Sequence, residues 1–282
     1  RRKQKIFLIL RYEDMREPQL GVAVGKKGIG KTYTTMQMIQ SYANGGRGTK
    51  PRRALILDVN DEFQEVKGLS LSHVKLFSHH PKVEVRRVRP FNPDGSKMTL
   101  NEITDALKKI LDNYKGGLLL IEDVNKYVSD YAPNDLIGAL CTNRHTSTDI
   151  IMHFQSIGRI STKVWQNLNW IRFHKNTDSV DKHHKKFDDR HEALKIVELM
   201  VNKQYHQGDK RFFCTYNCDD EKIYGNYSKA QILEAIEDYI SFNYNKKIKP
   251  LLNMRDAKGK LKYTPEKAYT HTKNLLIKMY IP

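Results

Sequence analysis

The sequence contains little that would tie the chain to a membrane or to an oxidising compartment. Its 282 residues include three cysteines, Cys141, Cys214 and Cys218, which are too few and too unevenly spaced for a disulfide framework. The longest apolar runs, residues 6–10 and 118–121, fall far short of the roughly 20 residues that a membrane span needs. No small-residue cleavage site follows the basic amino terminus. We therefore expect a soluble protein with structural cysteines, located in the host cytoplasm or in a virus particle.

Acidic residues are also scarce. The chain has 32 Asp and Glu against 49 Lys and Arg, which gives a formal net charge of +17. The imbalance is strongest in the last forty residues, where ten Lys or Arg accompany two acids. This excess favours a polyanionic partner, nucleic acid before an anionic membrane, although a basic protein without such a partner remains an alternative.

Apolar segments alternate with amphipathic ones over the first 177 residues, which predicts an α/β core with a mainly parallel sheet. We expect strands at residues 6–10, 20–24, 53–59, 83–91, 118–123, 149–155 and 170–175. Helices are expected at residues 31–43, 99–113, 133–143 and 161–168. A long charged helix (179–205), a hairpin turning at Asp219 and Asp220, and a helix (229–242) should form an extension, residues 178–242, packed on the core. A basic tail, residues 243–282, follows and should end in a helix that begins at Thr264-Pro265.

Residues 25–32 read GKKGIGKT, which matches the P-loop pattern G-x-x-x-x-G-K-[ST] between a predicted strand and a predicted helix. The glycines allow backbone N–H groups to turn inward around phosphates, and the helix amino terminus adds a positive dipole. Lys31 is expected to reach the β and γ phosphates, and Thr32 to ligate Mg2+. The sequence therefore predicts a nucleoside triphosphate site lined by Gly25, Gly28, Ile29, Gly30, Lys31, Thr32 and Tyr33.

Two acids end the predicted strand LLLIED, at the carboxyl edge where open α/β sheets bind ligands. Glu122 and Asp123 are the candidates to hold Mg2+ and to activate water. The usual order in such sites is Asp then Glu, so the reversed order leaves open which acid does which. If the register is kept, Glu122 lies on the metal side and Asp123 activates water; a capping role for both is the alternative.

Two other classes of P-loop protein are disfavoured. A small GTPase would need an N-K-x-D motif to read guanine, and NKYV (125–128) lacks the aspartate. A small-molecule kinase would rarely be this basic, and no arginine-rich lid is evident.

Two further segments resemble those of the HerA/FtsK superfamily of DNA-translocating ATPases, in its viral genome-packaging and Zot-like branch. ILDVNDEF (56–63) resembles the signature hydrophobic-D-x-x-x-E-[YF], and NRHTSTDIIMHFQ (143–155) resembles an R-H-x-x-x-D segment that ends in glutamine. With the P-loop, the resemblance covers residues 18–176. It implies a RecA-like P-loop NTPase fold flanked by helices, with ATP and Mg2+ as cofactors.

The resemblance also implies roles for single residues. Gln155 would sense the γ-phosphate or the attacking water, although a strand-capping role is the alternative. Arg144 would act as an arginine finger on the nucleotide of a neighbouring subunit, with Arg159 and Arg172 as rivals. Other residues are expected to serve the structure: Asp58 and Glu62 at the edge of the site, and His145 and His153 in packing or facing solvent.

A finger supplied from a neighbour requires a homo-oligomeric ring, which in this superfamily is most often a hexamer. Basic side chains would grip DNA through its phosphates without reading sequence. A viral capsid or portal component is a further expected partner. Two functions remain open: a translocase that packages a viral genome, or a non-motor ATP-binding switch or assembly factor that binds nucleic acid. The expected DNA contacts, each of which could instead be a solvated face, are Arg52, Arg53, Arg86, Arg87, Arg89 and, with less weight, the carboxyl-terminal lysines. Phe242, Tyr244 and Tyr263 could stack on unpaired bases or belong to a small core.

Overall fold

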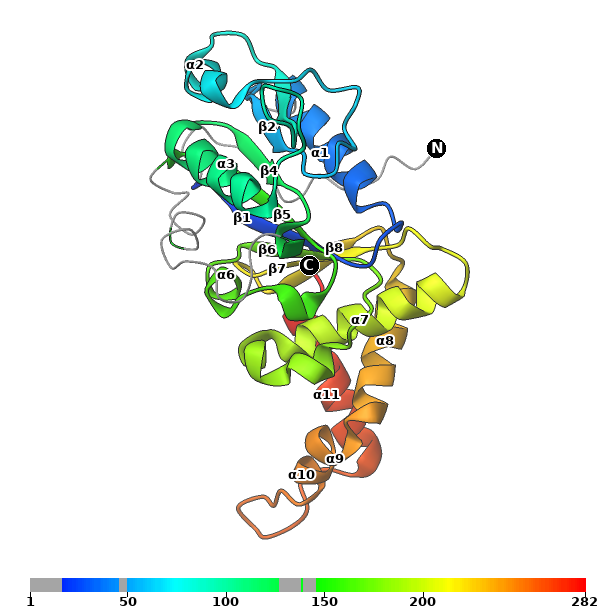
Figure 1. Ribbon diagram of the computed structural model, residues 1–282. Coiled ribbons are helices and arrows are strands. Elements are labelled where there is room, and N and C mark those ends of the chain that lie inside the picture. Colours follow the sequence, from blue (N-terminus) through cyan, green and yellow to red (C-terminus); the bar gives the residue numbers. More distant parts are fainter. Residues whose placement is uncertain (1–16, 46–49, 127–137, 139–145) are drawn as a thin grey trace.

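A sheet of eight strands forms the centre of the molecule (Figure 1), which a computed structural model describes for residues 17–45, 50–126, 138 and 146–282. The strand order is β3-β2-β4-β5-β1-β6-β7-β8. The first six of these are parallel: β3 (Val85–Val88), β2 (Ala54–Leu57), β4 (Leu118–Ile121), β5 (Asp149–Phe154), β1 (Leu20–Val24) and β6 (Trp170–Phe173). β7 (Cys214–Asn217) and β8 (Lys222–Gly225) run antiparallel. The expected mainly parallel α/β fold is therefore confirmed.

Five of the parallel strands consist mostly of apolar residues because the sheet is covered on both faces. Every residue of β1, β2, β4, β5 and β6 is buried. α1 (Lys31–Asn44) covers one face with Met38, Ile39 and Tyr42. The other face is covered by α3 (Leu100–Asn113), α6 (Thr162–Gln166) and α7 (His191–His206). The short α2 (Val74–His79) follows the 3-10 turn η2 (Leu71–His73) and packs near α3.

The carboxyl-terminal third both extends the sheet and projects away from it. The β7–β8 hairpin, predicted from the sequence, pairs with β6 and so continues the core sheet. α8 (Lys229–Phe242) packs on α7, and α11 (Pro265–Tyr280) packs on α8. α9 (Tyr244–Lys247) and α10 (Lys249–Leu252) lie at the far end of this projection, with residues 253–264 beyond them (Figure 1). The expected helices at 229–242 and after Thr264 are confirmed.

The expected continuous helix over residues 179–205 is wrong in its first half. Two 3-10 segments, η5 (Val180–Lys186) and η6 (Asp188–Arg190), precede α7. Tertiary contacts favour this path: the backbone N–H of Val180 donates to Glu198 at 2.9 Å, and the ring of buried Phe187 packs 4.4 Å from that of Trp165. The expected strand 6–10 lies outside the described residues, as does the expected helix 133–143 apart from residue 138.

Both edges of the sheet are covered. At the β3 edge, residues 67–69 pair with Arg87, whose N–H donates to the Lys67 carbonyl at 3.0 Å and whose carbonyl accepts from Leu69 at 2.7 Å. At the β8 edge, the side chain of Lys222 donates from Nζ to the carbonyls of Lys278 and Met279 at the end of α11, at 2.7 and 2.9 Å. Within the described ranges, no helix is long and apolar enough to cross a membrane.

Candidate nucleotide-binding site

The P-loop joins β1 to α1, as the motif predicts, and is fixed at its start by two neighbouring strands. The N–H of Gly25 donates to the Phe154 carbonyl at 3.1 Å, and that of Lys26 donates to the Lys175 carbonyl at 2.9 Å. Gly25 has φ of 151°, and a Cβ atom there would lie 2.8 Å from the Cβ of His174. Gly30 has φ of 88° at the amino terminus of α1. Glycine is therefore required where the loop leaves β1 and where it enters α1.

Lys31 is buried, and its ammonium group lies against its own loop. It donates to the carbonyl of Gly25 at 2.5 Å and to that of Lys26 at 3.0 Å. Burial lowers the pKa of Lys31, although the nearby Asp123 and Glu122 carboxylates oppose that shift. The charge is thus held beside the loop that should contact phosphates.

Glu122 follows β4 and is almost fully buried, with 3 % of its surface exposed. Thr32 Oγ1 donates to Glu122 Oε1 at 3.4 Å, so the P-loop threonine and this acid lie on the same side of the site. Burial raises the pKa of Glu122 to about 8, and the negative charges of Glu62, Asp58 and Asp123 add to the effect.

Asp123 lies directly beside Glu122 but in a different environment. Its φ of 44° is in the left-handed region, which is uncommon for a residue with a side chain. Gln155 Nε2 donates to both carboxylate oxygens at 3.2 Å, and Lys126 Nζ lies 3.1 Å from Oδ2. Burial alone would raise the pKa of Asp123, but hydrogen bonds from Asn60, Gln155 and Lys126 outweigh it and lower the pKa. Two adjacent acids with opposite shifts are suited to different roles.

Asn60 is a site residue that the sequence reasoning missed. Its amide donates to Asp123 Oδ2 at 2.9 Å and lies 3.5 Å from Glu122 Oε2, and its carbonyl accepts from Lys126. Its place within ILDVNDEF was the available signal. Asp58, in the same segment, is fully buried and accepts from the N–H groups of Glu62 and Phe63 at 2.9 and 3.1 Å. Asp58 therefore shapes the edge of the site, as expected.

Arg172 is wrong as a rival arginine finger. In the sheet register, Arg172 of β6 and His153 of β5 flank Ala23 of β1, on the face that α1 covers. Arg172 is 1 % exposed and donates to the Lys31 carbonyl at 3.3 Å and to the Thr35 hydroxyl. A side chain enclosed beneath α1 cannot reach a neighbouring subunit. His153 is buried as well, and its ring bonds to Thr35 at 2.8 Å, in agreement with a packing role.

The other finger candidates differ in what the structure describes. Arg144 lies outside the described residues, as do His145 and Cys141. Arg159 is exposed at the end of η4 (Ile157–Arg159), four residues after Gln155. Arg144 stays a prediction, and Arg159 is exposed as a finger must be.

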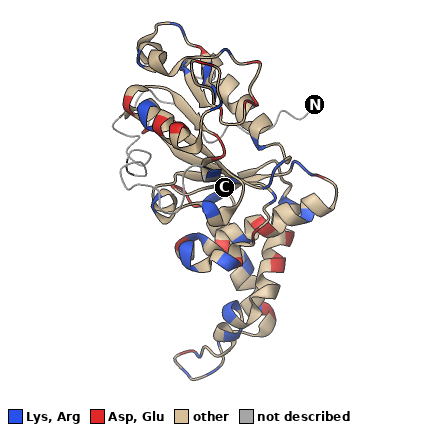
Figure 2. Ribbon diagram, viewed as in Figure 1, with Lys and Arg blue, Asp and Glu red and all other residues tan. Residues whose placement is uncertain are grey.

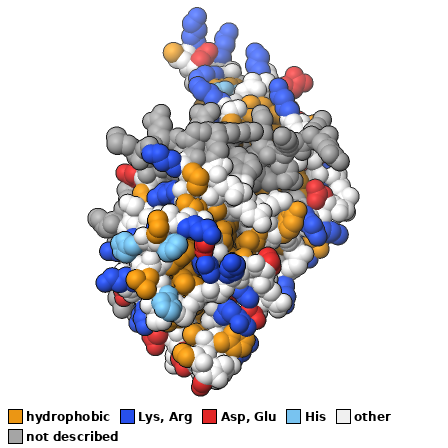
Figure 3. All heavy atoms as spheres, turned by 90° about the horizontal axis from the view of Figure 1, so that it is seen from above, with side chains coloured by type: hydrophobic (Ala, Val, Ile, Leu, Met, Phe, Trp, Pro, Cys, Tyr) orange, Lys and Arg blue, Asp and Glu red, His pale blue; other side chains and the backbone are white. Residues whose placement is uncertain are grey.

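Most arginines expected to grip DNA are instead engaged within the chain. Arg87 is 6 % exposed and pairs with Asp58 at 2.6 Å, and Arg53 donates to the carbonyls of Ser78 and His80. Arg87 is therefore wrong as a DNA contact, whereas Arg53, which is partly exposed, stays a prediction. The remaining three, Arg52, Arg86 and Arg89, lie near the carboxylates of Asp149, Glu84 and Asp61, respectively. Figure 3 shows the upper end from above, where described Lys and Arg side chains form small separate groups among apolar and neutral ones.

Comparison with solved structures supports the architecture. The genome packaging NTPase B204 from Sulfolobus turreted icosahedral virus 2, in complex with AMPPCP, is 16 % identical with a TM-score of 0.51; the match covers 74 % of this chain and 97 % of that one. B204 from Sulfolobus turreted icosahedral virus, a DNA-packaging ATPase, is 17 % identical with a TM-score of 0.50 over 75 % and 98 % of the two chains. No protein-family model matches the chain, and no curated protein has a significantly similar sequence. The expected P-loop NTPase fold is thus confirmed, and the resemblance to the packaging branch of the HerA/FtsK superfamily stays a prediction from the sequence motifs.

Proposed function

We propose that the chain is an ATPase that drives DNA translocation and packages a viral genome. The observation that carries the proposal is the grouping of a P-loop with two buried acids of opposite pKa shift, in contact with Thr32 and Gln155. Triphosphate cleavage needs positive charge for the phosphates, oxygen ligands for Mg2+, and a group that orients water. This grouping offers all three.

Thr32 and Glu122 are the residues that would hold Mg2+ in this proposal. They fit because both present oxygen atoms beside the P-loop, 3.4 Å apart. In the described part of the chain no three His, Cys, Asp or Glu side chains gather as a metal site. Mg2+ in NTPases typically uses one or two carboxylates and completes its shell with phosphate oxygens and water. When bound, the ion would neutralise charge on the transferring phosphoryl group.

Asp123 is assigned to the attacking water. Its lowered pKa keeps it ionised, as a general base must be, and Gln155 is bonded to both of its oxygens. Gln155 can turn its amide between Asp123 and a γ-phosphate, which suits a sensor. Lys31 would leave its loop carbonyls to contact the β and γ phosphates. Arg144, or Arg159 in its place, would complete the nucleotide site of a neighbouring subunit in a homo-oligomeric ring of six subunits.

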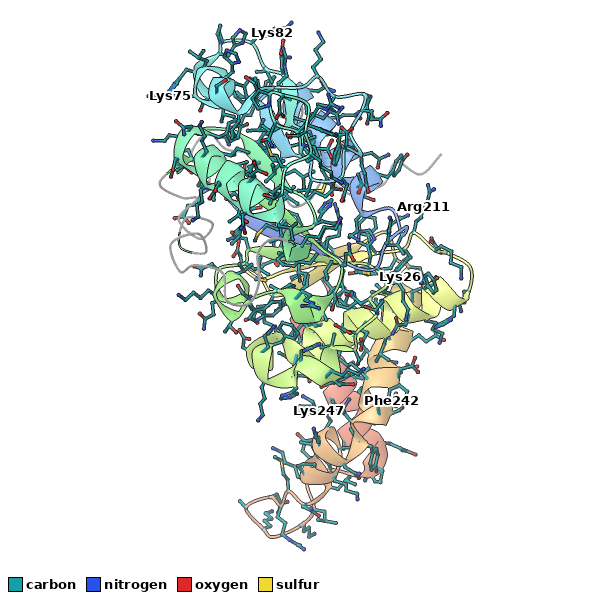
Figure 4. All side chains as sticks on the ribbon, viewed as in Figure 1. Lys26, Lys75, Lys82, Arg211, Phe242 and Lys247 are labelled. Atoms are coloured by element: carbon teal, nitrogen blue, oxygen red, sulfur yellow. The ribbon has the colours of Figure 1, made fainter. Side chains whose placement is uncertain are left out.

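The DNA contact is assigned to the far end of the carboxyl-terminal projection, which we call the basic tip. It comprises six exposed cations: Lys246, Lys249, Arg255, Lys258, Lys260 and Lys262. None of the six pairs with an acid among the described residues. The local acid, Asp256, instead accepts from the N–H groups of Lys258 and Lys260 at 2.8 and 2.9 Å. Figure 2 shows Lys and Arg in blue along this projection, and Figure 4 labels Phe242 on it. Phe242 is 73 % exposed and Leu261 61 %, so apolar side chains are also exposed there.

The test is to measure ATP hydrolysis with and without DNA, together with displacement of a third strand from a DNA triplex. A packaging motor should hydrolyse faster on DNA and displace the strand only with ATP. DNA affinity should be nearly independent of sequence and fall on the order of a thousandfold between about 50 and about 200 mM salt for some six phosphate contacts. Tight ATP binding with slow turnover and no displacement would support the switch or assembly factor instead.

A further inference from the structure

The segment between α7 and β7, residues 207–213, lies beside the P-loop (Figure 4, where Lys26 and Arg211 are labelled). Lys26 Nζ donates to the hydroxyl of Tyr205, near the end of α7, at 2.7 Å. A Cβ atom placed on Gly30 would lie 3.6 Å from both Cγ and Cδ of Arg211. The Arg211 guanidinium carbon lies 5.7 Å from the centre of the Tyr33 ring. Arg211 therefore reaches the first turn of α1 from a distant part of the chain.

Arg211 approaches α1 on the side away from the acids. Gly30 and Tyr33 are three residues apart and so share one face of the helix, whereas Thr32 points away from that face toward Glu122. The strand order of the sheet also places Arg211 on the side away from the acids. β4 and β5, which carry the acids and Gln155, lie on one side of β1, while β6 and β7 lie on the other. Arg211 precedes β7, so the hydrolytic groups and Arg211 flank the P-loop from opposite sides.

This placement identifies which end of a nucleotide Arg211 would meet. In a P-loop the γ-phosphate lies toward the lysine and the metal-binding threonine. The ribose and base then extend toward the other side of the first helical turn, where Tyr33 is 58 % exposed. The Arg211 side chain is also exposed, and its guanidinium forms no hydrogen bond or ion pair with any described residue. A planar cation and an aromatic ring thus border the path of the base.

We propose that Arg211 and Tyr33 bind the base of the nucleotide by stacking, so that the site accepts ATP and GTP with little discrimination. The inference rests on the proposed ATPase function and deepens it by naming the substrate class. A guanidinium plane and a tyrosine ring both stack on purines, and stacking is insensitive to the hydrogen-bonding edge that distinguishes adenine from guanine. The extension thereby contributes directly to the nucleotide site of the core.

The experiment measures the binding of MgATP, MgGTP and magnesium tripolyphosphate by calorimetry, for the unaltered protein and for Arg211→Ala. Tripolyphosphate carries the phosphates without a nucleoside. Loss of one stacking partner should weaken ATP and GTP binding about tenfold each and leave tripolyphosphate binding unchanged. In the unaltered protein the affinities for ATP and GTP should agree within about threefold, because stacking does not read the base edge.

Three further variants test whether the effect is specific to stacking by Arg211 and Tyr33. Lys210→Ala removes the neighbouring cation, which lies over Tyr205 at 4.0 Å, and should leave all three affinities unchanged. Tyr33→Ala should resemble Arg211→Ala, and Tyr33→Phe should bind as the unaltered protein does. Thermal unfolding of each variant establishes that it is folded.

Separate results would overturn the separate proposals. Equal weakening of ATP and tripolyphosphate by Arg211→Ala would place Arg211 on the phosphates, and unchanged ATP binding would reduce it to a packing contact; either result overturns this inference alone. A strong preference of the unaltered protein for one purine would overturn it too. Failure of the unaltered protein to bind any of the three ligands would instead overturn the nucleotide site, and with it both proposals.

Discussion

The core and the carboxyl-terminal projection use charge in opposite ways. In the core, buried charged groups are paired: Arg87 with Asp58, and Asp123 with Lys126, which is itself exposed. At the basic tip, six cations are exposed without an acidic partner among the described residues. Buried charges require fixed partners because desolvation is costly, whereas exposed cations remain free to bind a polyanion.

Catalysis should therefore occur in the core, and DNA should bind at the basic tip. Variants of the core should remove hydrolysis and leave DNA binding in place. Variants of the tip should do the reverse. The following experiments test that separation, and each uses one region as the control for the other.

The largest effect is expected at Lys31 and at the finger. Lys31→Ala and Arg144→Ala should each lower ATP hydrolysis about a thousandfold or more, because each removes a cationic side chain that would stabilise the negative charge of the transferring phosphoryl group. If Arg144 acts on a neighbour, rings that mix the two variants should recover partial hydrolysis. Some interfaces then join an intact Lys31 pocket to an intact Arg144.

No recovery on mixing, from an Arg144→Ala protein that assembles normally, would argue against action between subunits. Arg159→Ala is then the variant to mix with Lys31→Ala. Lys31→Ala and Arg144→Ala should each retain DNA binding. A loss of DNA binding in either variant would contradict the separation of the core from the basic tip.

The acids should give the next largest effect, and the two should differ. Glu122→Gln should weaken Mg2+-dependent nucleotide binding, since Glu122 is the partner of Thr32. Asp123→Asn should still bind ATP but hydrolyse it about a hundredfold to a thousandfold more slowly, because it loses the group that activates water. Nucleotide binding and single-turnover hydrolysis are the measurements. Normal hydrolysis by both variants would exclude the end of β4 as the catalytic strand.

A buried pair in the core should contribute more to stability than an exposed one. Asp58 and Asp61 both contact Arg87 Nη1, at 2.6 and 2.5 Å, but the Asp58 side chain is fully buried and that of Asp61 is 25 % exposed. Asp58→Asn should lower the free energy of unfolding by about 3 kcal/mol. Asp61→Asn, the matched control, should lower it by less than about 1 kcal/mol. Equal losses in chemical denaturation would contradict the dependence on burial.

The smallest effect is expected at the tip, and it should spare catalysis. Replacing Lys258, Lys260 and Lys262 together by glutamine should weaken DNA binding by about tenfold or more at moderate salt and reduce the salt slope by about three. ATP hydrolysis in the absence of DNA should not change. The control variant replaces Lys75, Lys82 and Lys109 by glutamine. Figure 4 labels Lys75 and Lys82 at the opposite end of the molecule from Lys247. Equal loss of DNA binding in the control would place the contact elsewhere.

The parallel core was predictable because its strands are buried on both faces and therefore appear as short apolar runs. The expected strands at 20–24 and 149–155 agree with β1 and β5 to within one residue at either end. The P-loop and the two acids were likewise local signals, each at the carboxyl end of such a run. The sequence therefore located the candidate nucleotide site, although it left the roles of its side chains open.

What the sequence could not supply were relations between distant segments. Nothing local distinguishes Arg172, which lies beneath α1, from an exposed arginine in a strand. The 3-10 path of residues 180–190 depends on a contact with Glu198 in α7. Asn60 joins the acids only because β2 and β4 are neighbours in the sheet. Arg211 reaches the P-loop through a similar long-range approach.

The covered edges of the sheet restrict how copies of the chain can join. An unpaired edge strand invites another chain to add its own strand through main-chain hydrogen bonds. Here residues 67–69 bond to Arg87 at one edge, and at the other edge the side chain of Lys222 bonds to the end of α11. If copies of the chain assemble as proposed, they should therefore meet through side chains rather than through a shared sheet. Such an interface could shift with each turnover of the proposed ATPase while every subunit keeps its own fold.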